Sequence, residues 1–236
     1  MPHRFTYGTI EKYRDRDQIL NDIFGLRYQV YVNEWGFESP VDHPEGLEYD
    51  DFDDHSVHIY ACGDDGSQVI GTVRMILNSP LGFPIERHFD IQCLPPGIDR
   101  DAVAEISRLA VSKEFRRRAI DRKIFGAERF APNQIPSFML NGRDFRRHCE
   151  HALVRGLYIA LYRDSKAREI THWYAVMAKG LYTILKRWGI AFVQIGQERD
   201  YHGLRAPYLV NIESIERSLE KFDPVLYCEA RSGLMH

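Results

Sequence analysis

Several features that mark other protein classes are scarce or missing in this chain of 236 residues. No apolar run approaches the roughly 20 residues that a membrane-spanning helix needs, and the N-terminal segment MPHRFTYGTIEKYRDRDQ lacks the apolar core of a signal peptide. The four cysteines lie far apart without a CxxC pair, which argues against a zinc site or a disulfide framework. We therefore expect a soluble, cytoplasmic protein with no metal and no stable membrane insertion.

Phosphate-binding signatures and a surplus of positive charge are missing too. Neither GxGxxG nor GxxxxGK[ST] occurs, so nothing supports a dinucleotide or P-loop site. The formal net charge of −3 argues against a general nucleic-acid binder. The local basic patches FRRR (115–118) and RDFRR (143–147) are most simply solvated surface when taken alone. HCEH (148–151) has metal-ligand spacing but no evident third ligand, so a structural or surface role is favoured.

The chain does contain a regular succession of helix and strand patterns. Apolar residues at three- and four-residue spacing predict a helix over 15–32, and DDGS joins two predicted strands, 55–62 and 68–77, in a hairpin. The later predicted elements are a strand at 103–111, a helix near 150–163, a strand at 170–177, a helix at 179–188 ended by Gly189, strands at 190–196 and 208–212, and a short last helix. This order predicts one α/β (α+β) domain over 1–236, with an irregular or partly helical insertion at 119–149.

The predicted strand VAEISRLAV (103–111) carries polar residues where a buried strand should be apolar. Glu105, Ser107 and Arg108 lie in its middle, and a buried charge costs several kcal/mol unless it is paired or used. By the two-residue period of a strand, Glu105 and Ser107 share one face, while Arg108 points to the other. Arg108 then needs an acid on that opposite side.

Partners for these charges are available in the acidic segment EWGFESPVDHPEGLEYDDFDD (34–54), which is typical of a surface loop. Its candidate acids are Asp50, Asp51, Asp53 and Asp54. Arg27, at the edge of the first helix's apolar stripe, is a candidate for the same network. So is Arg74, which the strand period places on one face with Ile70, Thr72 and Ile76. The structural alternative is a buried ion cluster that only fixes the loop to the sheet, and charge pattern alone leaves both open.

Four segments, taken in order, resemble the autoinducer synthases, the acyl-homoserine-lactone synthases of the GNAT acyltransferase superfamily. The same pattern fits the N-acyl amino acid synthases and the acyltransferases associated with PEP-CTERM/exosortase systems. The matching segments are LRYQVYVNEWG (26–36), YDDFDDHSVHIYA (49–61), GTVRMI with Arg74, and EISRLAV with Glu105, Ser107 and Arg108. The later segment WYAVMAKGLYTILKRWG resembles the family's strand–helix unit beside the acyl chain. The resemblance implies a mixed central sheet flanked by helices, with strands that splay at the acyl site.

The activity that this resemblance implies is transfer of a fatty acyl group from a thioester to an α-amine. An ammonium has no lone pair, so the reaction needs a general base, and Glu105 is our candidate, with Ser107 binding substrate or water. The resemblance assigns the surrounding charge network and substrate contacts to Arg27, Trp35, Asp50, Asp53, Arg74 and Arg108. Candidates for binding the phosphopantetheine-linked donor are Leu109, Val111, Arg116, Arg117 and Arg118. Val176, Leu181 and Leu185 are candidates for the acyl pocket, with ordinary core as the alternative for each.

One departure from the superfamily pattern bears on the donor. GNAT enzymes that use acyl-CoA carry R/Q-x-x-G-x-G/A, whose backbone cradles a pyrophosphate. Here RRRAID (116–121) replaces the glycines with Ala119 and Asp121, which would crowd and repel that group. An acyl carrier protein is acidic and presents a single phosphate. It therefore suits the three arginines of this segment, to which Arg143, Arg146 and Arg147 would add. We expect an acyl carrier protein as partner and donor, with no bound cofactor.

The acceptor is less closely specified. Met75 and Leu109 stand where lactone synthases often have aromatic residues, which favours the amino-acid or exosortase-associated branch. The alternative is an acyl-homoserine-lactone synthase that uses S-adenosylmethionine. A second alternative is a GNAT-fold protein that binds without catalysing.

Overall fold

The computed structural model describes residues 5–11, 18–63, 66, 68–91, 94, 96–113 and 142–232, and for 142–151 it describes the backbone alone. Its strands are β1 (Thr6–Glu11), β2 (Ser56–Cys62), β3 (Val69–Leu77), β4 (Val103–Val111), β5 (His172–Met177), β6 (Val193–Gln194), β7 (Arg199–Asp200) and β8 (Leu204–Asn211). They form a sheet in the order β1-β2-β3-β4-β5-β8-β6, with β7 paired to β8. All pairs are antiparallel except β4 with β5, which confirms the predicted mixed sheet.

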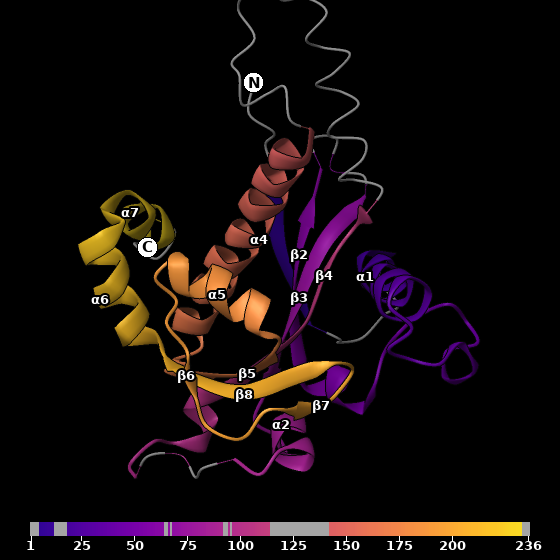
Figure 1. Cartoon of the computed structure of the whole chain (residues 1–236), viewed down its shortest axis with the longest axis horizontal. Coiled ribbons are helices and arrows are strands. Elements are labelled where there is room, and N and C mark those ends of the chain that lie inside the picture. Colours follow the sequence, from indigo (N-terminus) through magenta and orange to yellow (C-terminus); the bar gives the residue numbers. More distant parts are fainter. Residues whose placement is uncertain are drawn as a thin grey trace, which may run out of the picture.

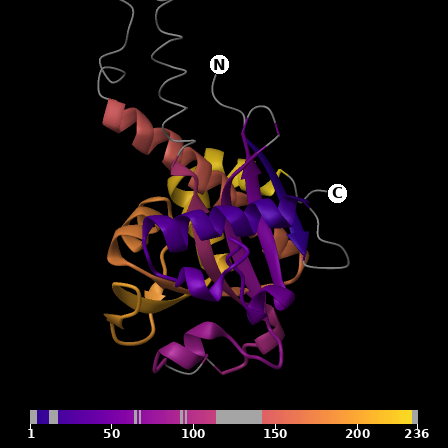
Figure 2. The same ribbon diagram turned by 90° about the vertical axis from the view of Figure 1, so that its right-hand side faces the viewer.

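Helices cover both faces of this sheet. They are α1 (Gln18–Tyr28), α2 (Pro84–His88), α4 (Gly142–Ala167), α5 (Lys179–Arg187), α6 (Ile212–Phe222) and α7 (Pro224–Arg231). Shorter turns are the π-helix η1 (Gln29–Glu34) and the 3-10 helices η2 (Pro40–Asp42), η3 (Asp51–His55) and η4 (Arg100–Ala102). Figure 1 shows α1 on one side of the central strands and α4 to α7 on the other. In Figure 2, α1 lies in front of the strands.

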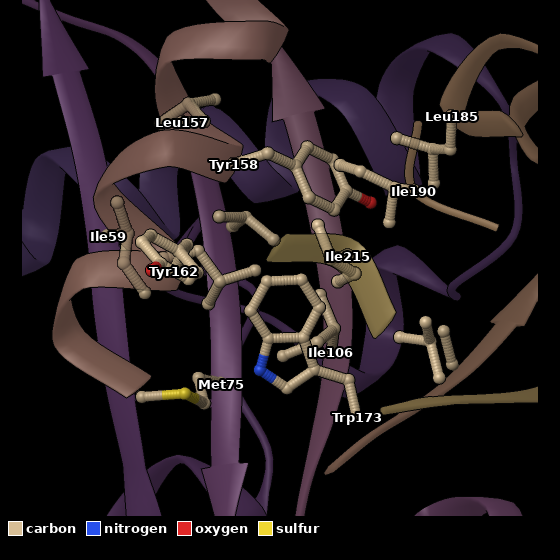
Figure 3. Close-up of a cluster of buried hydrophobic side chains, with 14 of the residues drawn as sticks. Ile59, Met75, Ile106, Leu157, Tyr158, Tyr162, Trp173, Leu185, Ile190 and Ile215 are labelled. Atoms are coloured by element: carbon tan, nitrogen blue, oxygen red, sulfur yellow. The ribbon is translucent and has the colours of Figure 1, made fainter. Parts of the chain in front are cut away.

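The main core lies between the sheet and α4. Met75 and Ile106 project from the central strands toward Leu157 and Trp173, as Figure 3 shows. The Trp173 indole N–H donates to Ser165 Oγ at 2.9 Å, which satisfies the one polar group of that large buried side chain. Gly71 of β3 lets α4 approach closely, because a Cβ there would come within 2.7 Å of a Leu153 methyl carbon. A smaller apolar cluster, with Ile23, Phe24 and Val30, lies under α1.

Strand irregularities overturn two of the predicted side-chain orientations. The first concerns Ile70, predicted to share a face with Arg74. Ala61 pairs with Gly71 but Cys62 pairs with Val69, so Ile70 is an extra residue in β3. Its side chain is therefore turned into the core on the α4 side, away from Arg74.

The second irregularity lies in β4 and decides the direction of Arg108. Arg74 pairs with Ser107 and Thr72 pairs with Ala110, so β4 has one residue more than β3 over this stretch. Arg108 has a φ of +52°, in the left-handed region that L-residues adopt at a cost of about 1 kcal/mol or more. The bulge brings Arg108 to the same side as Ser107. The prediction that Arg108 pairs with an acid on the opposite face was wrong, because a strand period holds only where the ladder is regular.

Other elements differ from the sequence prediction mainly in extent. β1, α2 and α7 were not predicted, and the strand predicted at 190–196 is reduced to Val193–Gln194. The helix predicted near 150–163 begins earlier, so residues 142–149 of the predicted insertion are its first turns. The rest of that insertion, 119–141, lies outside the described residues. The C-cap at Gly189 is confirmed by its φ of +86°.

Leu153 offers a test of the packing between α4 and the sheet. Leu153 is fully buried, so Leu153→Ala should lower the free energy of unfolding by about 2–5 kcal/mol through lost apolar contact and a residual cavity. Leu204→Ala is the matched control, because Leu204 is 61% exposed and its truncation should cost little. Urea unfolding of both variants measures the difference, and equal losses would contradict this packing.

Candidate functional site

A buried network of ions joins the acidic segment to the sheet. The Arg27 guanidinium donates to Asp53 through both terminal nitrogens, at 2.7 and 3.1 Å, and to Glu48 through Nε at 2.5 Å. All three side chains are almost completely inaccessible to solvent. Asp53 also accepts a hydrogen bond from Arg74 Nη1 at 2.9 Å. One carboxylate is thus shared by two arginines from different elements, α1 and β3.

Arg74 and Arg108 extend this network toward the centre of the sheet. Arg74 donates to Asp50 at 2.7 Å and, through Nε, to Ser107 Oγ at 3.0 Å. Arg108 pairs with Glu48 at 3.0 Å, and with Glu38 at 3.1 Å and Asp50 at 3.5 Å. Three arginines therefore meet four carboxylates, those of Glu38, Glu48, Asp50 and Asp53.

Local turns hold the acids in place. The backbone N–H of Asp50 donates to the Asp53 carboxylate, and the Asp50 carboxylate caps η3 by accepting from Phe52 N–H. This reciprocal capping box orients both acids through backbone contacts that do not involve the arginines. In the π-helix η1, Tyr31 donates its hydroxyl to the carbonyl of Leu109 at 2.9 Å, and the Arg108 guanidinium lies 5.4 Å from its ring centroid. Tyr31 thus supports the bulged part of β4.

The arginines decide the ionisation of the buried acids. Burial alone would raise the pKa of Asp53, but Arg27 and Arg74 outweigh it and hold this pKa below its ordinary value. Burial acts in the same way on Glu48, whose pKa Arg27 and Arg108 lower to about 2. His58 Nε2 lies 3.7 Å from Asp53, yet burial lowers the pKa of His58 to about 4, so its imidazole is neutral at pH 7. Asp53 and Glu48 are therefore ionised at neutral pH.

Glu105 is the exception among these carboxylates. It is 3% exposed and accepts the backbone N–H of Ile85, in the first turn of α2, at 2.9 Å. No arginine among the described residues pairs with it. Burial raises the pKa of Glu105 to about 7, while the Ile85 hydrogen bond and the charge of Arg74 only partly oppose this rise. A carboxyl that is half ionised near pH 7 suits proton transfer.

Two adjoining cavities open along β4, and Glu105 lines the first of them. The polar cavity, about 220 Å³, is lined by charged residues from the network and by the side chains of α2 and Tyr201. The residues of its wall that carry a charged, titratable or hydroxyl group are Tyr31, Asp50, Arg74, His88, Glu105, Ser107, Arg108, Tyr201 and Arg205. In Figure 1, α2 and the β7–β8 turn lie at the same end of the sheet.

The second, apolar cavity has a volume of about 390 Å³ and lies between β4 and β5. The parallel pairing of these strands ends at Ile106 with Ala175. Beyond that point the cavity is lined by Leu109 on one side and by Val176 and Met177 on the other. The predicted splay at the acyl site matches this arrangement. Both cavities share Tyr31, Ile106, Ser107, Arg108, Val176 and Arg205, so they meet at the bulge.

The predicted site residues fall into three groups. Glu105, Ser107, Asp50, Arg74 and Arg108 line the polar cavity, while Trp35, Leu109, Val176 and Leu181 line the apolar one. Arg27 and Asp53 lie behind the wall as buried support, Leu185 is ordinary core, and Val111 pairs with Gly71 outside both cavities. Arg116, Arg117, Arg118 and the side chains of Arg143, Arg146 and Arg147 lie outside the described residues.

Sequence reasoning missed five residues of the site. Glu38 and Glu48 belong to the acidic segment that was singled out, so its composition already contained the signal. His58, Tyr31 and Arg205 gave no such signal, because their roles depend on which elements meet in space. Met75 is buried in the core on the α4 side, so it does not contact the polar cavity.

The comparisons with known proteins agree with this geometry. Residues 26–125 match the acetyltransferase (GNAT) domain. That part of the chain is similar to a GNAT acetyltransferase domain. No curated protein matches the chain in sequence. The predicted GNAT-like fold is confirmed.

Solved structures with this GNAT fold include acyl-transferring synthases. TofI, in a ternary complex with an inhibitor and MTA, has a TM-score of 0.62 and 18% identity over 93% of this chain and 98% of its own. BjaI, a CoA-dependent acyl-homoserine lactone synthase with SAM and isopentyl-CoA, has a TM-score of 0.61 and 16% identity over 92% and 89%. FeeM, an N-acyl amino acid synthase from uncultured soil microbes, has a TM-score of 0.52 and 10% identity over 92% and 95%. At these identities the likeness is one of fold.

Within the described residues, the side chains form no metal site and the helices form no membrane span. No group of three or more His, Cys, Asp or Glu side chains there is placed to hold a metal ion. None of the helices in that part of the chain has the length and apolar character to cross a membrane.

Asp53→Asn tests the buried network. It leaves Arg27 and Arg74 facing a neutral amide, so the free energy of unfolding should fall by about 3–5 kcal/mol. Glu213→Gln is the control, because it breaks an exposed pair with Arg217 at 3.9 Å and should cost below about 1 kcal/mol. The measurement is urea unfolding at pH 7.

The same variant has an expected pH dependence. The Asp53 pKa is lower in the folded than in the unfolded chain, so its contribution is present above roughly pH 4 and is lost as pH falls through the folded value. The stability gap between wild type and Asp53→Asn should therefore persist from pH 8 down to pH 5. A gap that closes within this range would show that Asp53 is not ionised in the folded protein.

Proposed function

We propose that this protein is an N-acyltransferase that moves a fatty acyl group from an acyl carrier protein thioester to the amine of an amino acid or similar small molecule. The observation that carries the proposal is the junction of the two cavities. There Ser107 and Arg108 line both cavities, and Glu105, with a pKa of about 7, lines the polar one two residues before Ser107 in β4. In this proposal the whole chain, residues 1–236, acts as one such domain in the cytoplasm, with residues 142–149 belonging to α4.

The polar cavity takes the amine. An acceptor arrives as an ammonium ion, which the carboxylates of Asp50 and Glu105 attract. Glu105, directly or through a water, removes a proton, and the freed nitrogen lone pair attacks the thioester carbonyl. A C–N bond forms, the C–S bond breaks, and the leaving thiolate takes up a proton. Ser107, whose Oγ is held by Arg74 Nε, positions the acceptor or that water.

The apolar cavity takes the donor. Its volume of about 390 Å³ and its lining by Leu109, Val176 and Leu181 suit an acyl chain or the apolar part of a pantetheine arm. Backbone N–H groups of residues 109–111 are the expected oxyanion donors, and of these residues Leu109 lines the apolar cavity, so the oxyanion is assigned to the Leu109 N–H. Trp35, which is 63% exposed and stacked on Phe37, lies at the cavity wall and can cover the donor.

The choice of carrier protein as donor rests on RRRAID (116–121), where Ala119 and Asp121 stand in place of the glycines of a pyrophosphate cradle. The neighbouring arginines suit an acidic carrier with one phosphate. Purified acyl carrier protein and CoA carrying the same acyl chain test this directly. A kcat/KM at least tenfold higher for the CoA thioester would reverse the assignment.

A second acceptor remains a candidate, because BjaI has been solved with SAM and isopentyl-CoA. An acyl-homoserine-lactone synthase releases the lactone and methylthioadenosine, whereas an amide-forming enzyme releases neither. Expression in a bacterial host followed by mass spectrometry of culture lipids separates the two. N-acyl amino acids that disappear in Glu105→Gln support our proposal, and lactones support the alternative. A third outcome is that neither wild type nor Glu105→Gln forms an acylated product while both bind their ligand equally well. That outcome would indicate a GNAT-fold protein that binds without catalysing.

Glu105 also sets an expected pH profile. Below pH 7 its carboxyl gains a proton and can no longer accept one, so kcat/KM should fall about tenfold per pH unit on the acid side. Glu105→Gln should lower kcat/KM by about 10²- to 10⁴-fold and remove the limb near pH 7. Glu213→Gln, an acid-to-amide change in an exposed pair on α6, should leave both unchanged. A limb near pH 7 that survives in Glu105→Gln would assign it to another group.

A further inference from the structure

The arginines that line the polar cavity differ in whether an acid neutralises them. Arg74 contacts Asp50 and Asp53, and Arg108 contacts Glu38, Glu48 and Asp50. Their charges are already matched, and the network as a whole has one carboxylate more than it has arginines. It therefore attracts an ammonium group and offers no unpaired cation to an anionic one.

Arg205 in β8 is different. It lines both cavities, yet among the described residues no carboxylate pairs with it. The hydrogen bonds that its guanidinium makes there are two long ones, at 3.4 Å, to the carbonyl of His202. A guanidinium has five N–H donors, so most of its capacity stays available to a ligand.

The guanidinium is also held in a fixed place. It stacks over the Phe37 ring at 5.2 Å from the centroid, and Phe37 in turn stacks on Trp35. Half-buried in this way, Arg205 loses little further conformational freedom when it binds an anion. It is thus a preorganised cation at the junction of the cavities, on a different strand from the Glu105 carboxyl.

An α-amino acid carries one charge for each of these two kinds of group in the polar cavity. Its ammonium group finds the carboxylates of Asp50 and Glu105, and its carboxylate finds the planar fork of a guanidinium, which binds carboxylates through two parallel hydrogen bonds. We propose that Arg205 binds the α-carboxylate of the acceptor and thereby restricts the acceptors to α-amino acids over simple amines. This inference rests on the proposed N-acyl transfer.

The experiment compares wild type with Arg205→Met, Arg205→Lys and Arg199→Met, all as full-length protein. The acceptors are the one identified in the wild-type product and its carboxamide, which lacks the negative charge. Arg199 is the matched control. It faces Arg205 across the β7–β8 pair but lines neither cavity and donates to the carbonyl of His88.

With the amino acid, Arg205→Met should raise the acceptor KM by about 10- to 100-fold, with kcat within a fewfold of wild type. With the carboxamide, wild type should already show that higher KM, and Arg205→Met should raise it no further. Arg205→Lys should recover part of the loss, and Arg199→Met should behave as wild type. The donor KM should stay unchanged throughout.

Other results overturn the inference in separable ways. An equal rise for amino acid and carboxamide would make Arg205 a structural residue, and a rise in the donor KM alone would assign it to the donor's phosphate. A wild-type product whose acceptor has no carboxylate would also overturn it while leaving acyl transfer in place. If wild type formed no acylated product with any donor, the proposed function itself would fail.

Discussion

The site depends on the ion pair between Arg27 and Asp53. Two fully buried charges of opposite sign meet there at 2.7 Å, and Asp53 is shared with Arg74. Removing an ion from water costs several kcal/mol, so each member is tolerable only while its partners stay in place. Because Arg27 belongs to α1, Arg74 to β3 and Asp53 to η3, the pairing fixes the acidic segment against the sheet. The wall of the polar cavity exists only when that segment is docked.

The bulge in β4 depends on the ion pairs of this network. At Arg108 the backbone takes a φ of +52°, which costs free energy that a regular strand would not. The cost is offset where the guanidinium meets Glu48, whose other oxygen is bound to Arg27. The same irregularity lies just past Ile106, where pairing with β5 ends and the apolar cavity opens. The extra residue of the bulge thus directs the Arg108 guanidinium into the ion network. It also lies where β4 and β5 separate.

These two features explain what the sequence could and could not predict. The hairpin, the helices α1, α4, α5 and α6 and the charged residues of β4 follow from periodicity and from the cost of burying charge, and these were predicted. The direction of Arg108 and of Ile70 was not, because a bulge has no signature in the two-residue period. α2 was missed since a five-residue helix among prolines has no period to detect. Arg205 was missed because it is distinguished by having no carboxylate partner among the described residues, which only the assembled fold reveals.

Glu48 and Glu105 show how the same type of side chain can serve as a fixed charge at one position and as a proton acceptor at another. Both are buried, and burial alone raises the pKa of each. Glu48 lies between Arg27 and Arg108 and stays ionised, so it can hold an arginine but cannot exchange a proton near pH 7. Glu105 receives one backbone N–H from α2 in place of an arginine, and its pKa is about 7. The short helix α2, unnoticed in the sequence, supplies enough stabilisation to tolerate a carboxylate there and too little to make its ionisation permanent.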